Sequence, residues 1–161
     1  MCIRDRDRVT LPLEQGFASF EDSAGADPVQ RLRAVMALVF RSVASDEHTR
    51  RVFEIALYKV EYVSELMGLR ERHVAASEGF TQQLARDFAL AAESQGVMLS
   101  MSAMEAAISL HALFDGLIRN WILNEGGFDL VRVGGASTDA FLQGVGLSLD
   151  GSKESMRPCR D

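Results

Sequence analysis

The sequence predicts an all-α fold, an antiparallel bundle of about five to six helices, and three observations lead to that prediction. Apolar residues recur at three- and four-residue spacing through most of the chain, as on the buried face of an amphipathic helix. No alternating run rich in Val, Ile and Thr is bounded by turn residues, as a strand would be. The 161 residues, 47% hydrophobic and 25% charged, suit one folded domain.

The first core helix is expected over residues 28–45, after a polar loop at 21–26. Asp27 supplies an N-cap, and Pro28 takes the first helical position, where its missing N–H costs nothing. The buried face of this helix is expected to hold Val29, Leu32, Val35, Met36, Val39, Phe40 and Val43.

Three further helices are predicted from residues that start and stop helices. Ser45 and Asp46 open one over about 47–63, and the next, over about 65–95, ends at Gly96. Ser102 caps a helix over about 103–124, which two glycines at 126–127 stop. A last helix falls somewhere within 129–149, and its bounds stay open because four glycines interrupt its pattern.

Both ends stand apart from this pattern. The opening Met-Cys-Ile-Arg-Asp-Arg resembles a translated sequencing adaptor, so residues 1–6 are expected to be an artefactual leader. The polar, patternless residues 151–161 are expected to be a disordered or artefactual tail, which leaves 25–150 as the domain. The two cysteines, Cys2 and Cys159, lie in these ends, so neither a core disulfide nor a metal or cofactor is expected.

Charge and motifs argue against several classes of function. A net charge of −6 with a pI near 5.1 disfavours a nucleic-acid surface. No apolar run approaches the roughly 20 residues of a membrane span, so no membrane partner and a cytoplasmic location are expected. The chain has no Glu-x-x-His pair of a di-iron bundle and no Gly-x-Ser-x-Gly motif of a serine hydrolase. It also lacks the Gly-Lys-Ser/Thr of a phosphate-binding loop, so we do not expect the chain to be an enzyme.

The helix at 103–124 is apolar nearly all round. One face holds Ala103, Ala106, Ala107, Leu110, Leu113, Phe114, Leu117, Ile118 and Trp121. A different face holds Met104, Ile108, His111, Asp115, Arg119 and Ile122. Such a helix needs cover on two sides, from its own domain and from a partner subunit.

Two segments carry a resemblance to a known family. Residues 49–62 read Thr-Arg-Arg-Val-Phe-Glu-Ile-Ala-Leu-Tyr-Lys-Val-Glu-Tyr, and residues 113–123 read Leu-Phe-Asp-Gly-Leu-Ile-Arg-Asn-Trp-Ile-Leu, with Phe-Asp-Leu at 128–130. Both resemble the AcrR/TtgR (MAATS-type) branch of TetR-family repressors, at the separation found in that branch. The resemblance covers about residues 11–147. It implies the effector-binding and dimerisation domain, with 7–24 as the end of a linker helix and its loop, and without the helix-turn-helix head.

Two sets of site residues are expected, the first from the resemblance and the second from the broad apolar stripe of the 103–124 helix and from the last helix. Around a largely apolar pocket for an apolar or aromatic drug-like molecule the resemblance places Met36, Val39, Phe53, Leu57, Phe80, Leu84, His111, Phe114, Asp115 and Arg119. On a homodimer interface we place Leu110, Leu113, Leu117, Trp121, Phe141 and Val145. Core packing is the alternative role for each apolar residue among them.

Two roles are possible for the Asp115 and Arg119 pair and for His111. Asp115 and Arg119 stand four residues apart, so they form either polar anchors for a ligand or a solvated helix-face pair worth a few tenths of a kcal/mol. His111 either donates to Asp115 or a ligand, or is a satisfied core histidine. Glu54, Lys59 and Glu61 are expected to be structural ion-pair positions.

The function expected from the sequence is therefore ligand sensing and dimerisation in a TetR-type transcriptional repressor, of a multidrug-efflux system. Operator DNA is a partner only through the N-terminal head. The alternative is a stand-alone helical module that binds a small molecule or dimerises without DNA activity.

Overall fold

The structure of the chain is a computed structural model that describes residues 27–54 and 67–150. Its helices are α2 (Pro28–Ser45), α3 (Glu47–Glu54), α4 (Met67–Gln95), α5 (Ala103–Leu123) and α6 (Leu130–Gly144). No strand occurs in those two ranges, which confirms the all-α prediction. The expectations for residues 1–26, for 55–66 and for 151–161 lie outside the described residues.

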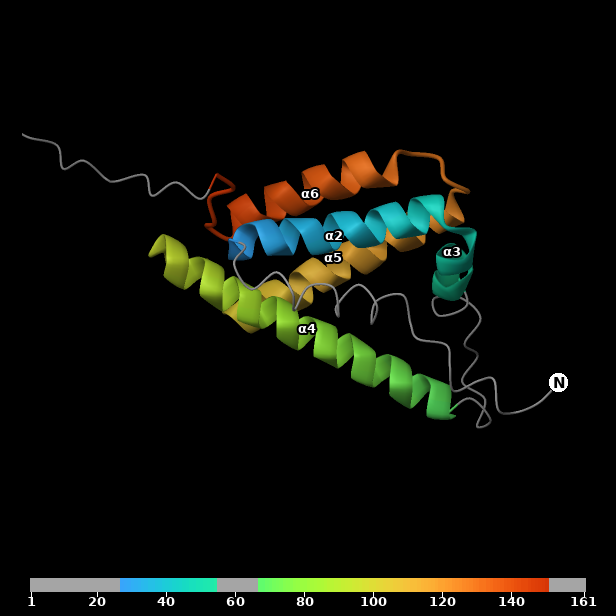
Figure 1. Cartoon of the computed structure of the whole chain (residues 1–161), viewed down its shortest axis with the longest axis horizontal. Coiled ribbons are helices and arrows are strands. Elements are labelled where there is room, and N and C mark those ends of the chain that lie inside the picture. The colour runs from blue at the N-terminus through green and yellow to red at the C-terminus, as the bar shows by residue number, and fades with distance from the viewer. Residues whose placement is uncertain (1–26, 55–66, 151–161) are drawn as a thin grey trace, which may run out of the picture.

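α2 is the centre of the bundle, because it packs against each of the other four helices. α6 lies beside α2 and runs in the opposite direction, and the long α4 and α5 form a second antiparallel pair (Figure 1). The short α3 follows at the far end of α2. None of the helices in the described ranges is long and apolar enough to cross a membrane.

The helix boundaries follow from capping residues. Asp27, Ser102 and Asp129 each accept a hydrogen bond from a backbone N–H in the first turn of the helix that follows. Ser102 and Glu105 form a reciprocal capping box at the start of α5. Gly96, just after α4, has a φ of +67°, the left-handed conformation of a C-cap glycine. The starts of α2 and α5 and the end of α4 are therefore where the sequence predicts them.

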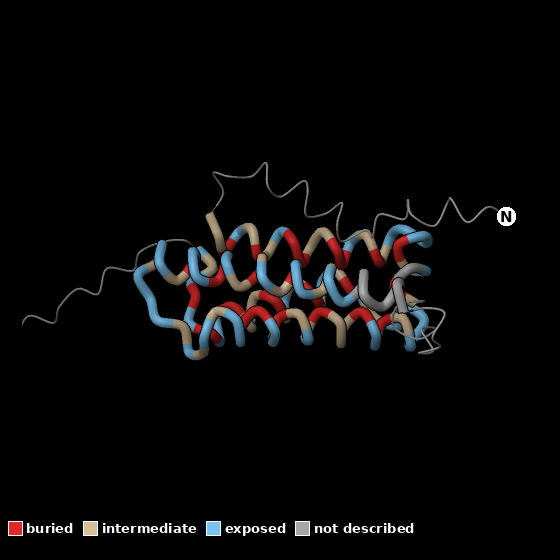
Figure 2. The backbone as a smooth tube through the Cα atoms, turned by 90° about the horizontal axis from the view of Figure 1, so that it is seen from below, coloured by how far each residue is buried: buried red, intermediate tan, exposed pale blue. Residues whose placement is uncertain are grey.

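The core lies between the inner faces of these helices, where buried positions recur at each turn (Figure 2). All seven residues predicted on the buried face of α2 are buried. The largest fully buried side chains elsewhere are Phe80, Phe88, Phe114, Leu84, Leu110, Ile118, Leu130 and Leu142.

The glycines of α6 have two different environments. A Cβ added to Gly134 would lie 2.5 Å from two ring carbons of Phe40, so this glycine lets α6 approach α2 closely. A Cβ added to the neighbouring Gly135 would meet nothing within 4 Å. Close packing against α2, which the sequence pattern does not reveal, therefore accounts for a glycine inside this helix.

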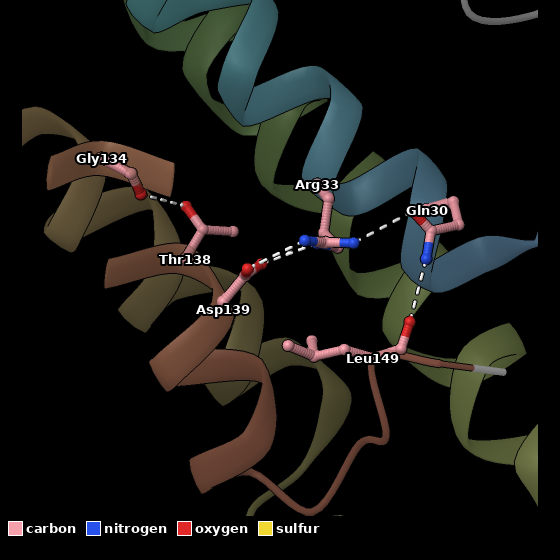
Figure 3. A network of polar contacts seen from close by, with 6 residues as sticks. All are labelled: Gln30, Arg33, Gly134, Thr138, Asp139 and Leu149. Atoms are coloured by element: carbon pink, nitrogen blue, oxygen red, sulfur yellow. Dashed lines mark hydrogen bonds and ion pairs between the residues drawn. The ribbon is translucent and has the colours of Figure 1, made fainter. Parts of the chain in front are cut away.

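Hydrogen bonds and an ion pair link α2 to α6 (Figure 3). The guanidinium of Arg33 donates to both carboxylate oxygens of Asp139, at 2.6 and 2.9 Å, and this hydrogen bonding raises the pKa of Arg33. Gln30 donates to the carbonyl of Leu149 at 2.9 Å, which ties the segment after α6 to the start of α2. These contacts are partly exposed, so they specify how the helices align more than they stabilise the fold.

A second ion pair, between α2 and α4, is much more buried. Arg31 Nη2 lies 2.9 Å from Asp87 Oδ1, and the two side chains are 15% and 5% exposed. A carboxylate so far removed from water needs its cationic partner, because an unpaired buried charge is costly.

Candidate functional site

Aromatic rings from four helices meet at one place in the bundle. Phe114 of α5 lies in the middle, with its ring centroid 5.5 Å from Phe40 of α2, 6.3 Å from Phe53 of α3 and 6.0 Å from Phe80 of α4. The ring of His111 stands edge-on to Phe80, 4.9 Å between centroids. We call these five residues the aromatic cluster. The rings are tilted or edge-to-face, the arrangements that aromatic pairs favour.

Helical spacing explains how α5 supplies two members of the aromatic cluster. Phe114 lies one turn from both Leu110 and Ile118, and all three side chains are buried along one stripe of α5. His111 is offset from that stripe and is less deeply buried, with its side chain 15% exposed. The cluster therefore has an apolar interior and an imidazole at its edge.

Polar groups on α4 and α5 surround the imidazole of His111. Its Nδ1 lies 2.9 Å from the hydroxyl of Thr81 on α4. Its Nε2 lies 3.6 Å from Oδ2 of Asp115, one turn further along α5. Aromatic surface thus adjoins hydrogen-bonding groups, the combination found in sites for small organic molecules. No group of three or more His, Cys, Asp or Glu within residues 27–54 and 67–150 could hold a metal ion.

The structure brings three of the predicted pocket residues, Phe53, Phe80 and Phe114, together in the aromatic cluster. Three more, Met36, Val39 and Leu84, are buried in the same hydrophobic core. Leu57 lies outside the described residues. The burial of the apolar members fits a ligand-binding wall and a packed core equally, so their role stays a prediction.

Asp115 and Arg119 are more exposed than the apolar sequence around them suggests. The side chain of Asp115 is 48% exposed, and Arg119 is exposed. Asp115 approaches His111, its neighbour one turn earlier, at 3.6 Å. Helical periodicity places a residue on a face but does not say how deeply neighbouring helices cover that face.

The residues predicted for a dimer interface divide into two groups. Leu110, Trp121 and Val145 are buried within the chain itself, at 1%, 8% and 2% exposure. Leu113, Leu117 and Phe141 are half-buried and retain surface for a partner. The indole N–H of Trp121 donates to the carbonyl of Phe128 at 2.9 Å, so the turn after α5 covers this ring.

Sequence reasoning missed two residues at this site. Helical periodicity predicts Phe40 in the core but does not mark it as a site residue, although its ring is the nearest of the three phenylalanine rings that contact Phe114. No pattern in the sequence marks Thr81, the hydrogen-bonding partner of His111, as a site residue. The two partners are thirty positions apart on different helices, and the pattern within one helix cannot pair them. Thr81 follows Phe80 directly, which is the one local signal for it.

The family model for the C-terminal region of MAATS-type transcriptional repressors matches residues 27–146. The match begins at the N-cap of α2 and ends just after α6, so it contains the whole aromatic cluster. The chain belongs to this family. The resemblance to the AcrR/TtgR branch of TetR-family repressors is thereby confirmed, and the relatives are transcriptional repressors, a class of protein that is not enzymatic.

Individual relatives agree with the family. The HTH-type transcriptional regulator TtgR of Pseudomonas putida is 28% identical over 111 residues, which cover 69% of this chain and 53% of TtgR. The probable acrEF/envCD operon repressor of Escherichia coli is 26% identical over 118 residues, covering 73% of this chain and 53% of that protein. The chain therefore spans about half the length of these curated relatives.

A solved structure shares the fold. The crystal structure of NalD from Pseudomonas aeruginosa, described as the secondary repressor of the MexAB-OprM multidrug efflux pump, aligns with a TM-score of 0.72 and 26% identity. The alignment covers 86% of this chain and 70% of NalD. The two proteins therefore share a fold over the aligned residues.

Proposed function

We propose that this chain senses a small-molecule effector and dimerises within a TetR-type transcriptional repressor of a multidrug-efflux system. One observation carries the proposal: the MAATS-type region coincides with the helices that enclose the aromatic cluster and its polar edge. Relatives that regulate efflux operons support the biological setting. A transcriptional regulator works beside the DNA, so we place it in the cytoplasm.

The proposed effector is an apolar or aromatic, drug-like molecule. An aromatic ring that enters the cluster must displace or insert between rings from α2, α3, α4 and α5. Phe53 is the part of α3 in contact with Phe114, so occupancy of the cluster bears directly on the position of α3. The effector changes repression only to the extent that it binds the operator-bound and released states with different affinities.

Effector binding should raise the melting temperature of the chain by mass action, because the compound binds the folded state and not the unfolded chain. The test is thermal unfolding of the chain with a planar cationic dye and with a neutral aromatic, each at increasing concentration. Wild type should show a rise that grows with concentration, and Phe80→Leu should lose most of it through lost ring contact.

Phe88→Leu is the matched control for that experiment. Phe88 lies two turns after Phe80 on α4, is fully buried, and packs against Phe141 rather than Phe114. Both variants should lower the melting temperature without ligand, but only Phe80→Leu should reduce the ligand-induced rise. An equal loss of that rise in both variants would contradict a site at the aromatic cluster.

Dimerisation is proposed through α5 and α6, with Leu113, Leu117 and Phe141 as half-buried contacts. Sedimentation velocity at micromolar concentration should therefore show a dimer, and Leu117→Glu should shift it toward monomer because a charge is buried unpaired at the interface. A monomeric wild type would contradict this part of the proposal.

Operator DNA is proposed to bind through a head that precedes the matched region in the full-length repressor, since the relatives are about twice as long as the matched region. The net charge of −6 fits a domain that does not itself hold phosphates. Sequencing the gene upstream of Leu11 separates this function from a stand-alone ligand-binding module. An in-frame helix-turn-helix supports the repressor, and a true start codon there contradicts it.

A further inference from the structure

We infer that Arg50 of α3 is a positioning residue for the aromatic cluster, because its contact with Trp121 of α5 holds Phe53 in place. An effector that displaces Phe53 then works against that contact. Arg50 acts on a ligand only through Phe53. The effect on ligand binding rests on the proposed effector site, whereas the link between Arg50 and Phe53 does not.

The guanidinium of Arg50 joins its own helix to α2 and to α5. Its Nη2 donates to the carbonyl oxygen of Ala44 at 3.0 Å, and its Nε donates to that of Val43 at 3.4 Å. These carbonyls belong to the last turn of α2, the negative end of the helix dipole, and that turn has no basic residue of its own. The guanidinium carbon lies 4.9 Å from the centroid of the Trp121 ring, within the range of a cation–π contact.

Trp121 is a fixed anchor for that contact. It is 8% exposed, and its indole N–H donates to the carbonyl of Phe128 at 2.9 Å. A Cβ added to Gly126 would lie 3.4 Å from Cζ2 of the indole, so the turn after α5 also packs against this ring. Because the turn holds the indole in place, the ring cannot follow Arg50, and a movement of α3 breaks their contact.

Arg50 and Phe53 lie about one turn apart on α3, so their side chains leave the same side of the helix. They contact two residues of α5 that are about two turns apart, Trp121 and Phe114. The ring centroids of Phe53 and Phe114 are 6.3 Å apart. Both contacts join α3 to α5, so a helix that lifts away at one of them also strains the other.

Among the phenylalanine rings of the aromatic cluster, Phe53 is the one that an incoming molecule displaces most easily. Phe40, Phe80 and Phe114 are 1–2% exposed and lie on α2, α4 and α5, which pack on one another in the core. Phe53 is 8% exposed and lies on α3, at the end of α2 (Figure 1). Its displacement leaves the packing of those three helices intact, but it costs the contact of Arg50.

Acrylamide quenching of fluorescence tests the link without a ligand, because Trp121 is the single tryptophan of the chain. Arg50→Met should raise the quenching constant about twofold, since one face of the indole loses its cover. Phe53→Leu should also raise it, because the ring contact with Phe114 that helps to hold α3 on α5 is lost. Arg51→Met, at the exposed position next to Arg50, should leave it unchanged. An unchanged constant in Arg50→Met or in Phe53→Leu overturns the inference.

Calorimetric titration with 2-naphthol tests the effect on the proposed effector site. Arg50→Met should lower the melting temperature of the ligand-free chain and yet bind 2-naphthol about five- to tenfold more tightly, because displacing Phe53 no longer costs the contact with Trp121. Arg50→Lys keeps the charge without the planar fork of donors, so its affinity should lie between the two. Arg51→Met should bind as wild type does.

A merely structural role for Arg50 predicts the opposite sign, since a loosened fold does not by itself improve binding. Equal or weaker binding by Arg50→Met therefore overturns the effect on the ligand, and Arg50→Lys carries the same comparison if Arg50→Met does not fold. Failure of 2-naphthol to bind wild type and both variants counts against the proposed effector site. The quenching measurements still decide the link between Arg50 and Phe53 in that case.

Discussion

Replacing Arg31 with Met should lower the free energy of unfolding by about 3–5 kcal/mol, a large part of the stability of a domain this size. The substitution keeps most of the aliphatic bulk of the side chain and removes the charge that faces Asp87. Because the carboxylate of Asp87 is 5% exposed, water cannot replace the guanidinium that lies 2.9 Å from it. The buried carboxylate would be left without this partner between α2 and α4.

Urea unfolding of three variants measures this effect. Arg33→Met is the matched control, since Arg33 lies on the same helix and pairs with Asp139, but both partners are about one-third exposed. Its cost should stay within about 1 kcal/mol. The double variant Arg31→Met with Asp87→Leu should recover most of the loss, because two apolar side chains replace the whole ion pair. Equal losses in Arg31→Met and Arg33→Met would show that burial does not set the strength of these pairs.

Two neighbouring alanine substitutions in α6 should change stability in opposite directions. In Gly134→Ala the new methyl group would lie 2.5 Å from ring carbons of Phe40. Phe40 is 1% exposed and packs on Phe114, so its ring has little room to move. Overpacking of this kind costs about 1–3 kcal/mol, more than the helix gains by losing a glycine.

Gly135→Ala is the control for the backbone contribution. Its methyl group would meet no atom within 4 Å, so the substitution should stabilise α6 by up to about 1 kcal/mol. Thermal unfolding of the two variants beside wild type gives both signs in one experiment. A stabilised Gly134→Ala would contradict the close approach of α6 to α2.

The sequence predicted those features of the fold that depend on local chemistry. Asp27 and Pro28 mark the start of α2, and Ser102 marks the start of α5 through interactions within one or two turns. The buried face of α2 follows from helical periodicity alone, because one face of an amphipathic helix meets the core. These signals need no knowledge of what the helix packs against.

Features that depend on the partner of a helix could not be predicted in this way. The apolar periodicity of α5 does not show that Trp121 is covered by the turn after its own helix, through its bond to Phe128. It does not show that Asp115 keeps about half of its side-chain surface exposed. Likewise the close approach of Gly134 to Phe40 joins two helices that are the first and the last of the described helices in the sequence but lie side by side in the bundle. Each of these depends on tertiary packing, which the pattern of a single helix does not contain.

A calorimetric titration of wild type and Asp115→Asn, each with one planar cationic dye and one neutral aromatic, tests the proposed effector site most directly. Wild type should bind both compounds with micromolar-range affinity, since the cluster offers aromatic contact and Asp115 offers charge at its edge. Asp115→Asn should weaken the dye severalfold and leave the neutral compound nearly unchanged, because only the cation loses an opposite charge, one that is partly screened by water. Equal affinities in all four titrations would contradict the placement of an effector beside Asp115 and the aromatic cluster.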